Sequence, residues 1–272
     1  IDFPARDHVL VEQLRNKGAI IFAKAVNTEY NGRAGNPGGR HQPERVFPSV
    51  LGYQRSTWGG NPVNPYDTTR SASLGSSSGS ALSVSTNMVM ASLGEETRAS
   101  TRGPANHNAV ALILPHKSLL GFNGGAIGAD IYNDRSGVLC RTIGDCAKVL
   151  DALKDPIEGY YDPRDPFTTV PRSSSLVTTY ASHAQMPGEQ GSLEGFRVGI
   201  IRELMVFPEG SKTEEPIVIA AAREIKTILG DKLGATLLES SHSRWEKDPS
   251  MEPMKTDFTR ALARLVPVFM PE

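Results

Sequence analysis

The chain has 272 residues, which is enough for one large domain or two small ones with a buried core. A hydrophobic content of 39%, a charged fraction of 22% and a formal net charge of -1 are typical of a soluble globular protein, and they give no reason to expect nucleic acid or an anionic membrane as a partner. No apolar run approaches the roughly 18 residues that a membrane span requires, so we expect a soluble, cytoplasmic protein.

Metal-ligating residue types are sparse in this chain. It has two cysteines, Cys140 and Cys146, and six histidines that are scattered along the sequence. Two cysteines build no disulfide framework, and their spacing matches no common zinc-binding pattern. We therefore expect no metal site.

The first predicted element is a helix over residues 7–17, because apolar side chains recur there at helical spacing: Leu10, Val11 and Leu14. Gly18 offers the left-handed residue that commonly ends a helix. The next five residues, 19–23, are apolar and predict a short buried strand.

In the middle of the chain, an apolar stripe predicts one buried helix between two serine-rich segments: Ala81, Val84, Met88 and Ala91. The apolar runs 109–114 and 196–201 predict interior strands covered on both faces. Residues 142–145 resemble a capping box that opens a helix ending near Leu153, with Cys146 on its inner face.

The unit of helix, glycine and strand recurs near the C-terminal end. Pro216 suits a first helical turn, and an apolar stripe follows it: Ile217, Ala221, Ile225 and Ile228. Gly234 then precedes a predicted strand at 235–238. Alternating helices and buried strands favour an α/β fold over an all-helical or all-β fold.

Two segments, about 31–64 and 155–190, are rich in glycine and proline and predict loop-rich insertions. The chain starts at Ile1 without a methionine or a recognisable signal peptide, and it stops within an apolar stretch. We therefore expect residues 1–272 to be a single domain, incomplete and truncated at both ends, of a longer protein.

The two serine-rich segments carry the clearest chemical signal. Ser76 lies in a Gly-Ser-Ser-Ser-Gly-Ser run that leads into a helix N-terminus, and Ser100 stands 24 positions later, after Gly94. Free backbone N–H groups at a helix start favour developing negative charge. A phosphate-binding loop is a weaker interpretation, because no Gly-Lys-Ser/Thr follows. A pair of serines at this spacing suits a hydroxyl nucleophile with a hydroxyl relay.

The run from Asn64 to Ala105 resembles the signature of the amidase signature family of serine hydrolases. The segment Asn64-Pro65-Tyr66-Asp67 matches the family in full. Further matches lie in the two serine loops and just after them: Gly75, Ser76, Ser77, Gly79, Ser80, Ala81, Gly94, Thr97, Ser100, Arg102, Pro104 and Ala105. The resemblance implies an α/β/α sandwich around a large mixed β-sheet, with the core signature at 64–105.

The resemblance also implies roles for the two serines. Ser100 would be the nucleophile that is acylated by a linear carboxamide, and Ser76 would be the relay serine, held by a cis peptide bond. The backbone N–H groups of Thr97, Arg98, Ala99 and Ser100 would form the oxyanion hole. The resemblance implies no cofactor, and the expected partner is a small-molecule amide substrate. Whether the protein forms a homo-oligomer stays open.

The general base of the family is a lysine upstream of the helix that starts here at Asp7, so it is not in this chain. Lys17 and Lys24 lie in the wrong elements, and Lys117 is displaced from the second lysine of the family, which is not the catalytic one. We assign no lysine as catalytic.

Two alternatives to an active amidase stay open. A catalytically impaired homologue that acts as a binding or scaffold protein would explain Arg98 and Ala99, which stand at positions where the family has small, glycine-like residues. An amidotransferase A-type subunit ranks last, because nothing in the charge balance favours tRNA. Among the other side chains, we interpret Arg102, His107 and His116 as structural.

Overall fold

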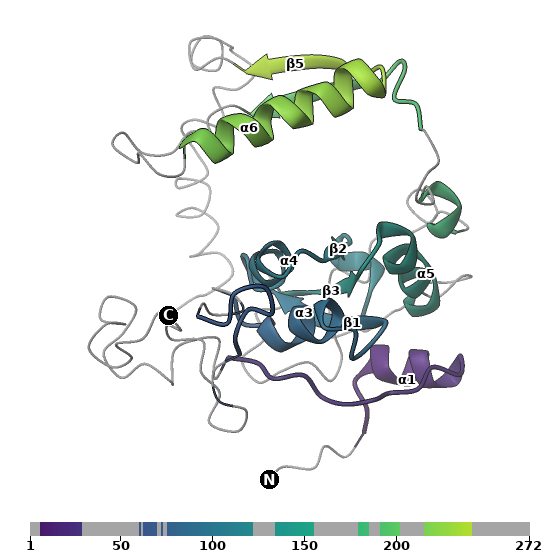
Figure 1. The fold of residues 1–272 in the computed structure, drawn as a ribbon. Helices are drawn as coiled ribbons and strands as arrows, with labels where there is room; N and C mark the ends of the chain where they lie inside the picture. Colours follow the sequence, from purple (N-terminus) through teal and green to yellow (C-terminus); the bar gives the residue numbers. More distant parts are fainter. Residues whose placement is uncertain are drawn as a thin grey trace, which may run out of the picture. The chain divides into compact units, whose positions relative to one another are not determined.

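The computed structural model describes residues 6–28, 60, 62–69, 72, 75–121, 134–154, 179–184, 191–201 and 215–240 (Figure 1). These residues belong to two compact units, Ile1–Pro187 and Gly188–Glu272. Most of the two predicted insertions, residues 31–59 and 155–178, lies outside the described residues. None of the described helices is both long and apolar enough to cross a bilayer.

The first unit begins with α1, Val9–Asn16, as the apolar spacing predicts. The helix starts at His8, whose Nδ1 accepts a hydrogen bond from the Leu10 N–H at 3.1 Å. Leu10 is 1% exposed and anchors the helix in the core. Gly18, at φ +85°, supplies the expected left-handed turn after the helix.

The strand predicted at 19–23 is wrong. These residues have no regular secondary structure, and Ile20 and Phe22 are 91% and 74% exposed. A strand needs a neighbour to pair its backbone N–H and C=O groups, and none of the described strands lies beside this segment. Apolar composition alone therefore does not make this segment a strand.

The predicted single helix between the serine loops is also wrong in its second half. Helix α3 covers only Ser78–Ser85, and strand β1, Ala91–Glu96, follows it. Asn87 adopts φ +62°, a left-handed conformation that no α-helix can continue. The hydroxyls of Ser85 and Thr86 bond back to the Leu82 carbonyl, which also favours ending a helix here.

The sheet of the first unit has the order β1-β3-β2, with β2 at Ala111–Ile113 and β3 at Arg135–Cys140. The central strand β3 is antiparallel to both neighbours and pairs Gly137 with Gly94. The sequence predicted neither β1 nor β3. The run at 109–114 is a strand only over three residues, because Ala109 adopts φ +50° and β2 forms an edge of the described sheet.

Helices cover both faces of this sheet, which gives the expected α/β/α layers (Figure 1). One core cluster lies between the sheet and two helices, α1 and α5, Ile143–Leu153: Leu10, Leu119, Leu120, Val138, Cys140, Cys146, Leu150 and Leu153. The other lies between the sheet and α3 and α4, Arg102–His107: Ala81, Val84, Ala105 and Leu139. Val138 and Leu139, adjacent on β3, therefore face opposite layers.

Helix α5, Ile143–Leu153, begins at the predicted capping box. The Thr142 hydroxyl oxygen accepts from the Asp145 N–H at 3.1 Å and donates to the Asp145 carboxylate at 2.8 Å. Cys146 lies on the buried face, as expected, and donates to the Val138 carbonyl at 3.2 Å. The short helices η2, Lys117–Leu119, and η5, Ala181–His183, complete the described part of this unit.

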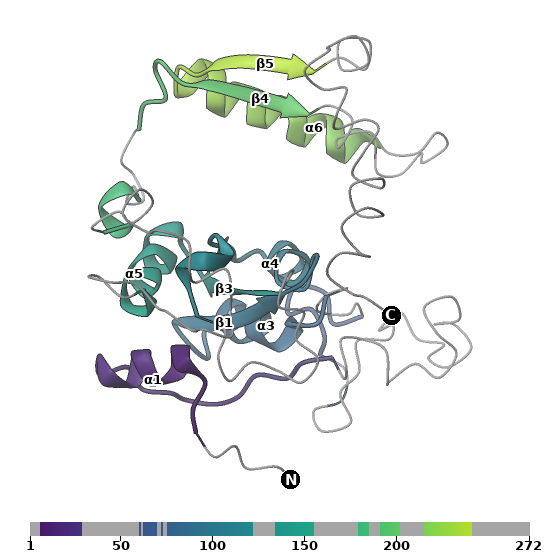
Figure 2. The same cartoon turned by 180° about the vertical axis from the view of Figure 1, so that it is seen from behind.

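The second unit pairs β4, Arg197–Ile201, in parallel with β5, Thr236–Ser240. Helix α6, Glu215–Lys226, and the π-helical turn Thr227–Lys232 connect them, and Figure 2 shows α6 running along the pair. Pro216 lies in the first turn of α6 and Gly234 has φ +81°, as the sequence suggests. The expectation that 196–201 is covered on both faces is wrong, since Phe196 precedes the strand and is 62% exposed.

Gly79 is a site where a single methyl group should damage the fold. A Cβ at Gly79 would lie 2.5 Å from the Val26 carbonyl oxygen and 2.6 Å from the Val26 nitrogen. Because both contacts are backbone atoms, we expect Gly79→Ala to destabilise the protein by about 2–4 kcal/mol in urea unfolding. Gly103→Ala is the matched control: its nearest neighbour would be 3.8 Å away, so it should be neutral or slightly stabilising. Equal stabilities would contradict the prediction.

Candidate active site

The fold brings the two serine loops into direct contact. The Ser77 N–H donates to the Ser100 carbonyl at 3.0 Å. The Ser77 hydroxyl accepts from the Glu95 N–H at 3.1 Å and donates to the Glu95 carbonyl at 3.2 Å. Ser77 therefore ties the loop before α3 both to β1 and to the turn after it.

Gly75 explains why the first loop contains glycine. A Cβ at this position would lie 2.7 Å from Pro104 Cδ, 2.9 Å from the Ala99 carbonyl oxygen and 3.0 Å from Ser100 Cα. Any side chain would push the two loops apart. The glycine thus permits close approach of the backbones, which is a different role from linker flexibility.

Ser76 lies beside this contact and is 6% exposed, whereas Ser100 is half-buried. The Ser76 carbonyl accepts from the Thr28 N–H at 3.1 Å, so the extended segment after α1 supports the loop. The cis peptide bond that the resemblance implies for Ser76 is wrong for this structure, because every peptide bond among the described residues is trans. For a bond that does not precede proline, trans is the form favoured by about 3–4 kcal/mol.

A buried carboxylate organises the backbone directly after Ser100. Glu96, at the end of β1, is 0% exposed, and its Oε2 accepts from the Thr101 N–H at 2.7 Å, the Thr101 hydroxyl at 2.9 Å and the Arg102 N–H at 3.2 Å. Arg102 Nε donates to the other oxygen at 2.6 Å. Arg102 is therefore structural, as the sequence suggests.

These contacts decide the charge of Glu96. Burial by itself would raise the pKa of its carboxyl group, but the hydrogen bonds from Thr101 and Arg102 outweigh burial and lower the pKa below 4.5. The carboxylate is consequently ionised at neutral pH, and it holds the turn that follows Ser100 by its backbone.

The turn from Thr97 to Ser100 contains the predicted oxyanion-hole residues. Arg98 and Ala99 are exposed, and neither adopts a positive φ, so their β-carbons do not strain the turn. Asp134 holds the side chain of Thr97, because the Thr97 hydroxyl donates to Asp134 Oδ1 at 2.5 Å. Sequence reasoning missed Asp134, which no motif marks and which lies 37 positions from Thr97.

The three lysines excluded from catalysis lie on other elements than the serine loops. Lys17 Nζ donates to the Ala152 carbonyl at 2.5 Å and thereby joins the end of α1 to the end of α5. Lys24 is exposed on the irregular segment after α1. Lys117 lies on η2, next to the core of the α5 face.

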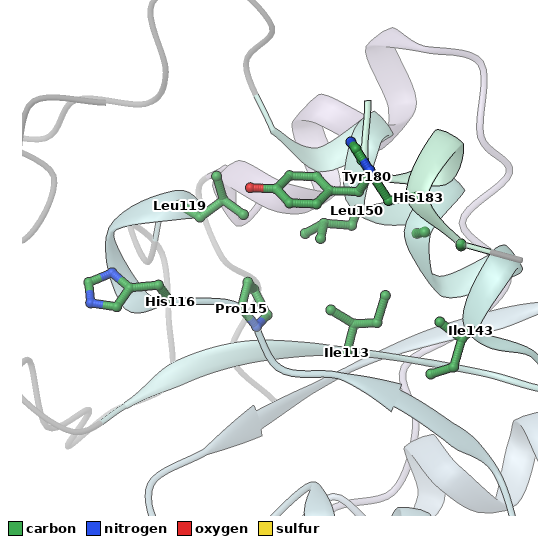
Figure 3. A pocket seen from close by; sticks show the side chains of 10 residues that line it. Ile113, Pro115, His116, Leu119, Ile143, Leu150, Tyr180 and His183 are labelled. Atoms are coloured by element: carbon green, nitrogen blue, oxygen red, sulfur yellow. The ribbon is translucent and has the colours of Figure 1, made fainter. Parts of the chain in front are cut away.

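The two thiols and the described cavity also lie apart from the serine loops. Cys140 and Cys146 are both 0% exposed, and the hydrogen bond between them, together with burial, raises the pKa of the Cys140 thiol. A cavity of about 300 Å³ opens on the α5 face (Figure 3). Tyr180, His183 and His116 line it together with apolar side chains, and no residue of either serine loop does.

Comparison with known proteins identifies the family. The family profile described as Amidase matches residues 2–243. The chain belongs to the amidase family. The matched range includes both serine loops and extends into the second unit.

Individual relatives agree with this assignment. A probable amidase of Arabidopsis thaliana is 34% identical over 197 residues, which cover 72% of this chain and 34% of the relative. The A-type subunit of the glutamyl-tRNA(Gln) amidotransferase of Anaeromyxobacter dehalogenans is 31% identical over 244 residues, which cover 89% of this chain and 42% of the relative. This amidase-family chain thus spans less than half the length of the curated relatives it matches.

Solved structures support the α/β fold of this family member. The peptide amidase of Stenotrophomonas maltophilia is 26% identical, with a TM-score of 0.63 over 89% of this chain and 43% of that protein. The peptide amidase solved with the inhibitor chymostatin gives the same TM-score at 27% identity, over 86% of this chain and 41% of that one.

Proposed function

We propose that the whole protein hydrolyses the C–N bond of a linear carboxamide through an acyl-enzyme on Ser100. The observation that carries this proposal is the contact between the serine loops. The Ser77 N–H to Ser100 carbonyl bond and the close approach of Gly75 to Ser100 Cα bring together two loops from opposite ends of the α3–β1 unit.

The chemistry follows from the groups in this contact. The Ser100 hydroxyl oxygen attacks the amide carbonyl carbon, and its proton passes through the Ser76 hydroxyl to a general base. The C–N bond then breaks, the same proton goes to the leaving nitrogen, and ammonia or an amine departs. Water attacks the resulting ester and frees Ser100. Backbone N–H groups of residues 97–100 stabilise the negative oxygen in both steps.

The family resemblance implies that the general base is a lysine of the same protein that lies outside residues 1–272. The contribution of this chain is the nucleophile, the relay and the rigid turn between Glu96 and Arg102. The mechanism is drawn without a cofactor, because the serine hydroxyl supplies the nucleophile and backbone N–H groups stabilise the negative oxygen.

A fluorophosphonate probe tests the nucleophile directly. We expect the whole protein to be labelled at Ser100 and to release ammonia or an amine from primary and secondary carboxamides. Peptide mass spectrometry after labelling would locate the modified residue, and prior heat denaturation should prevent labelling. Hydrolysis with the label on a different residue would contradict the assignment of Ser100.

A catalytically impaired homologue with a binding role is the second candidate. Arg98 is exposed and charged in the turn that would bind the oxyanion, at a position where the family resemblance implies a small residue. This candidate predicts no labelling and no amide hydrolysis by the whole protein. Activity gained by Arg98→Gly would show that this side chain is what blocks the site.

An amidotransferase A-type subunit is the third candidate, supported by the relative of that name that aligns with 89% of this chain. Such a protein would use ammonia from a partner in place of water. Co-purification of a glutaminase with the whole protein would favour this candidate over a free-standing amidase.

A further inference from the structure

Two carboxyl groups meet beside the turn that contains Ser100. Glu95, on β1, is hydrogen-bonded through its side chain to Asp134, which lies just before β3. Asp134 also accepts from the Thr97 hydroxyl at 2.5 Å. Asp134 is 3% exposed, so this contact is largely closed to water.

The same residue, Glu95, is held at its backbone by Ser77, next to Ser76. A continuous set of contacts therefore runs from the first serine loop through Glu95 and Asp134 to Thr97. Thr97 opens the turn that ends at Ser100. This set is separate from the Glu96 contacts, which hold the backbone after Ser100 at Thr101 and Arg102.

We propose that Glu95 and Asp134 are positioning residues, and that a proton on Glu95, donated to Asp134, holds the Thr97–Ser100 turn in its shape. With the proton present, the Glu95 carboxyl group donates to Asp134, which keeps an oxygen for the Thr97 hydroxyl. Without it, two carboxylates repel each other in a partly buried place, and the pair separates. The inference rests on the proposed function for its effect on catalysis, but not for its effect on the turn.

The titration range makes this pair relevant near neutral pH. Burial and the neighbouring Asp134 carboxyl group raise the pKa of Glu95 from 4.5 to about 7. Among the described residues, the elements packed against this pair contribute few other charges. Helix α3 carries none, β1 contributes Glu96, already bound to Arg102, β3 contributes Arg135, and α5 contributes Asp145, Lys148 and Asp151. Arg98 lies in the turn itself.

The sign of the pH dependence follows from this raised pKa. Between about pH 4.5 and about pH 7, folded Glu95 keeps a proton that the unfolded chain has lost. The pair therefore stabilises the folded state most below pH 4.5, and its contribution falls as pH rises to about 7. Opening of the turn should increase as pH rises through about 7 and above, where Glu95 loses this proton.

Glu95→Gln separates this role from simple packing. The glutamine amide can donate to Asp134 at every pH, so it imitates the protonated pair permanently. Asp134→Asn offers the second variant, because its amide can donate to ionised Glu95 while its oxygen accepts from Thr97. Glu12→Gln, at an exposed glutamate of α1, is the matched control with the same change of charge.

Amide hydrogen exchange and catalysis together provide the test, with the whole protein. After correction for intrinsic rates, exchange at residues 97–101 should increase above about pH 7 in the wild type and in Glu12→Gln, but not in Glu95→Gln or Asp134→Asn. The ratio of kcat/KM between Glu95→Gln and wild type should be about one at pH 6 and about threefold or more at pH 8.5.

The outcomes distinguish this inference from the proposed function. Identical exchange profiles in wild type and Glu95→Gln would overturn the inference, even if Ser100-dependent hydrolysis is found. A step in exchange without any hydrolysis would support the Glu95 proton and the held turn, and would contradict the proposed function alone. Equal pH profiles of kcat/KM in an active enzyme would remove the positioning role.

Discussion

Ser100→Ala in the whole protein should reduce amide hydrolysis by about a thousandfold or more, with little change in folding. The alanine removes the attacking oxygen but keeps the backbone of the turn, so substrate binding and the N–H groups of residues 97–100 remain. Steady-state kinetics should therefore show the loss in kcat and only a modest change in KM. Circular dichroism and urea unfolding should match those of the wild type.

Ser182→Ala is the matched control for this experiment. Ser182 is exposed on η5 and donates to the Thr179 carbonyl, so its loss removes an oxygen without touching either serine loop. We expect unchanged kinetics in this variant. Retained hydrolysis in Ser100→Ala would remove Ser100 from the mechanism, and Ser76 would then be the first alternative nucleophile to substitute.

Glu96→Ala should be the most damaging change to the turn itself, with a loss of about 3 kcal/mol in the free energy of unfolding. It leaves the Thr101 N–H and hydroxyl, both in a fully buried residue, without their acceptor. The Arg102 guanidinium can be hydrated by solvent instead, because its side chain is 59% exposed, so it contributes little to the loss of stability. Urea unfolding at neutral pH measures the difference.

Glu96→Gln makes the comparison specific to charge. Its amide oxygen can replace Oε2 and keep three of the four donors, while its amide nitrogen cannot accept from Arg102 Nε. We expect a loss of about 1 kcal/mol at neutral pH. Because the folded pKa of Glu96 is lowered, the wild-type advantage is present above about pH 4.5 and disappears as pH falls further. An advantage that persists in acid would contradict this account.

Local signals were sufficient where an element depends on its own residues. The capping box at Thr142 and Asp145, the stripe of α1 and the glycines at positions 18 and 234 each predicted a feature that the structure contains. In each case the decisive contact joins residues a few positions apart. Such contacts form in the same way wherever the segment lies in the fold.

Whether a segment forms a strand depends on a pairing partner that its own sequence does not reveal. Strand β1 reads Ala-Ser-Leu-Gly-Glu-Glu, with little intrinsic preference for a strand, and it forms because β3 pairs with it along its whole length. The apolar segment at 19–23 is the opposite case: its composition suggests a strand, but no described strand pairs with it. Pairing between distant segments decided both cases.

For the candidate site, the sequence by itself determined the family, the two serine loops and the glycine and arginine positions around them, because these occur in short runs at fixed spacing. Only the tertiary structure decided how the loops meet and what holds them. Gly75 has to approach Ser100, Ser77 has to reach Glu95, and Asp134 has to return to Thr97 from 37 positions away. A hydrogen bond across that distance in sequence exists only after β3 has paired with β1, so no local pattern could predict it.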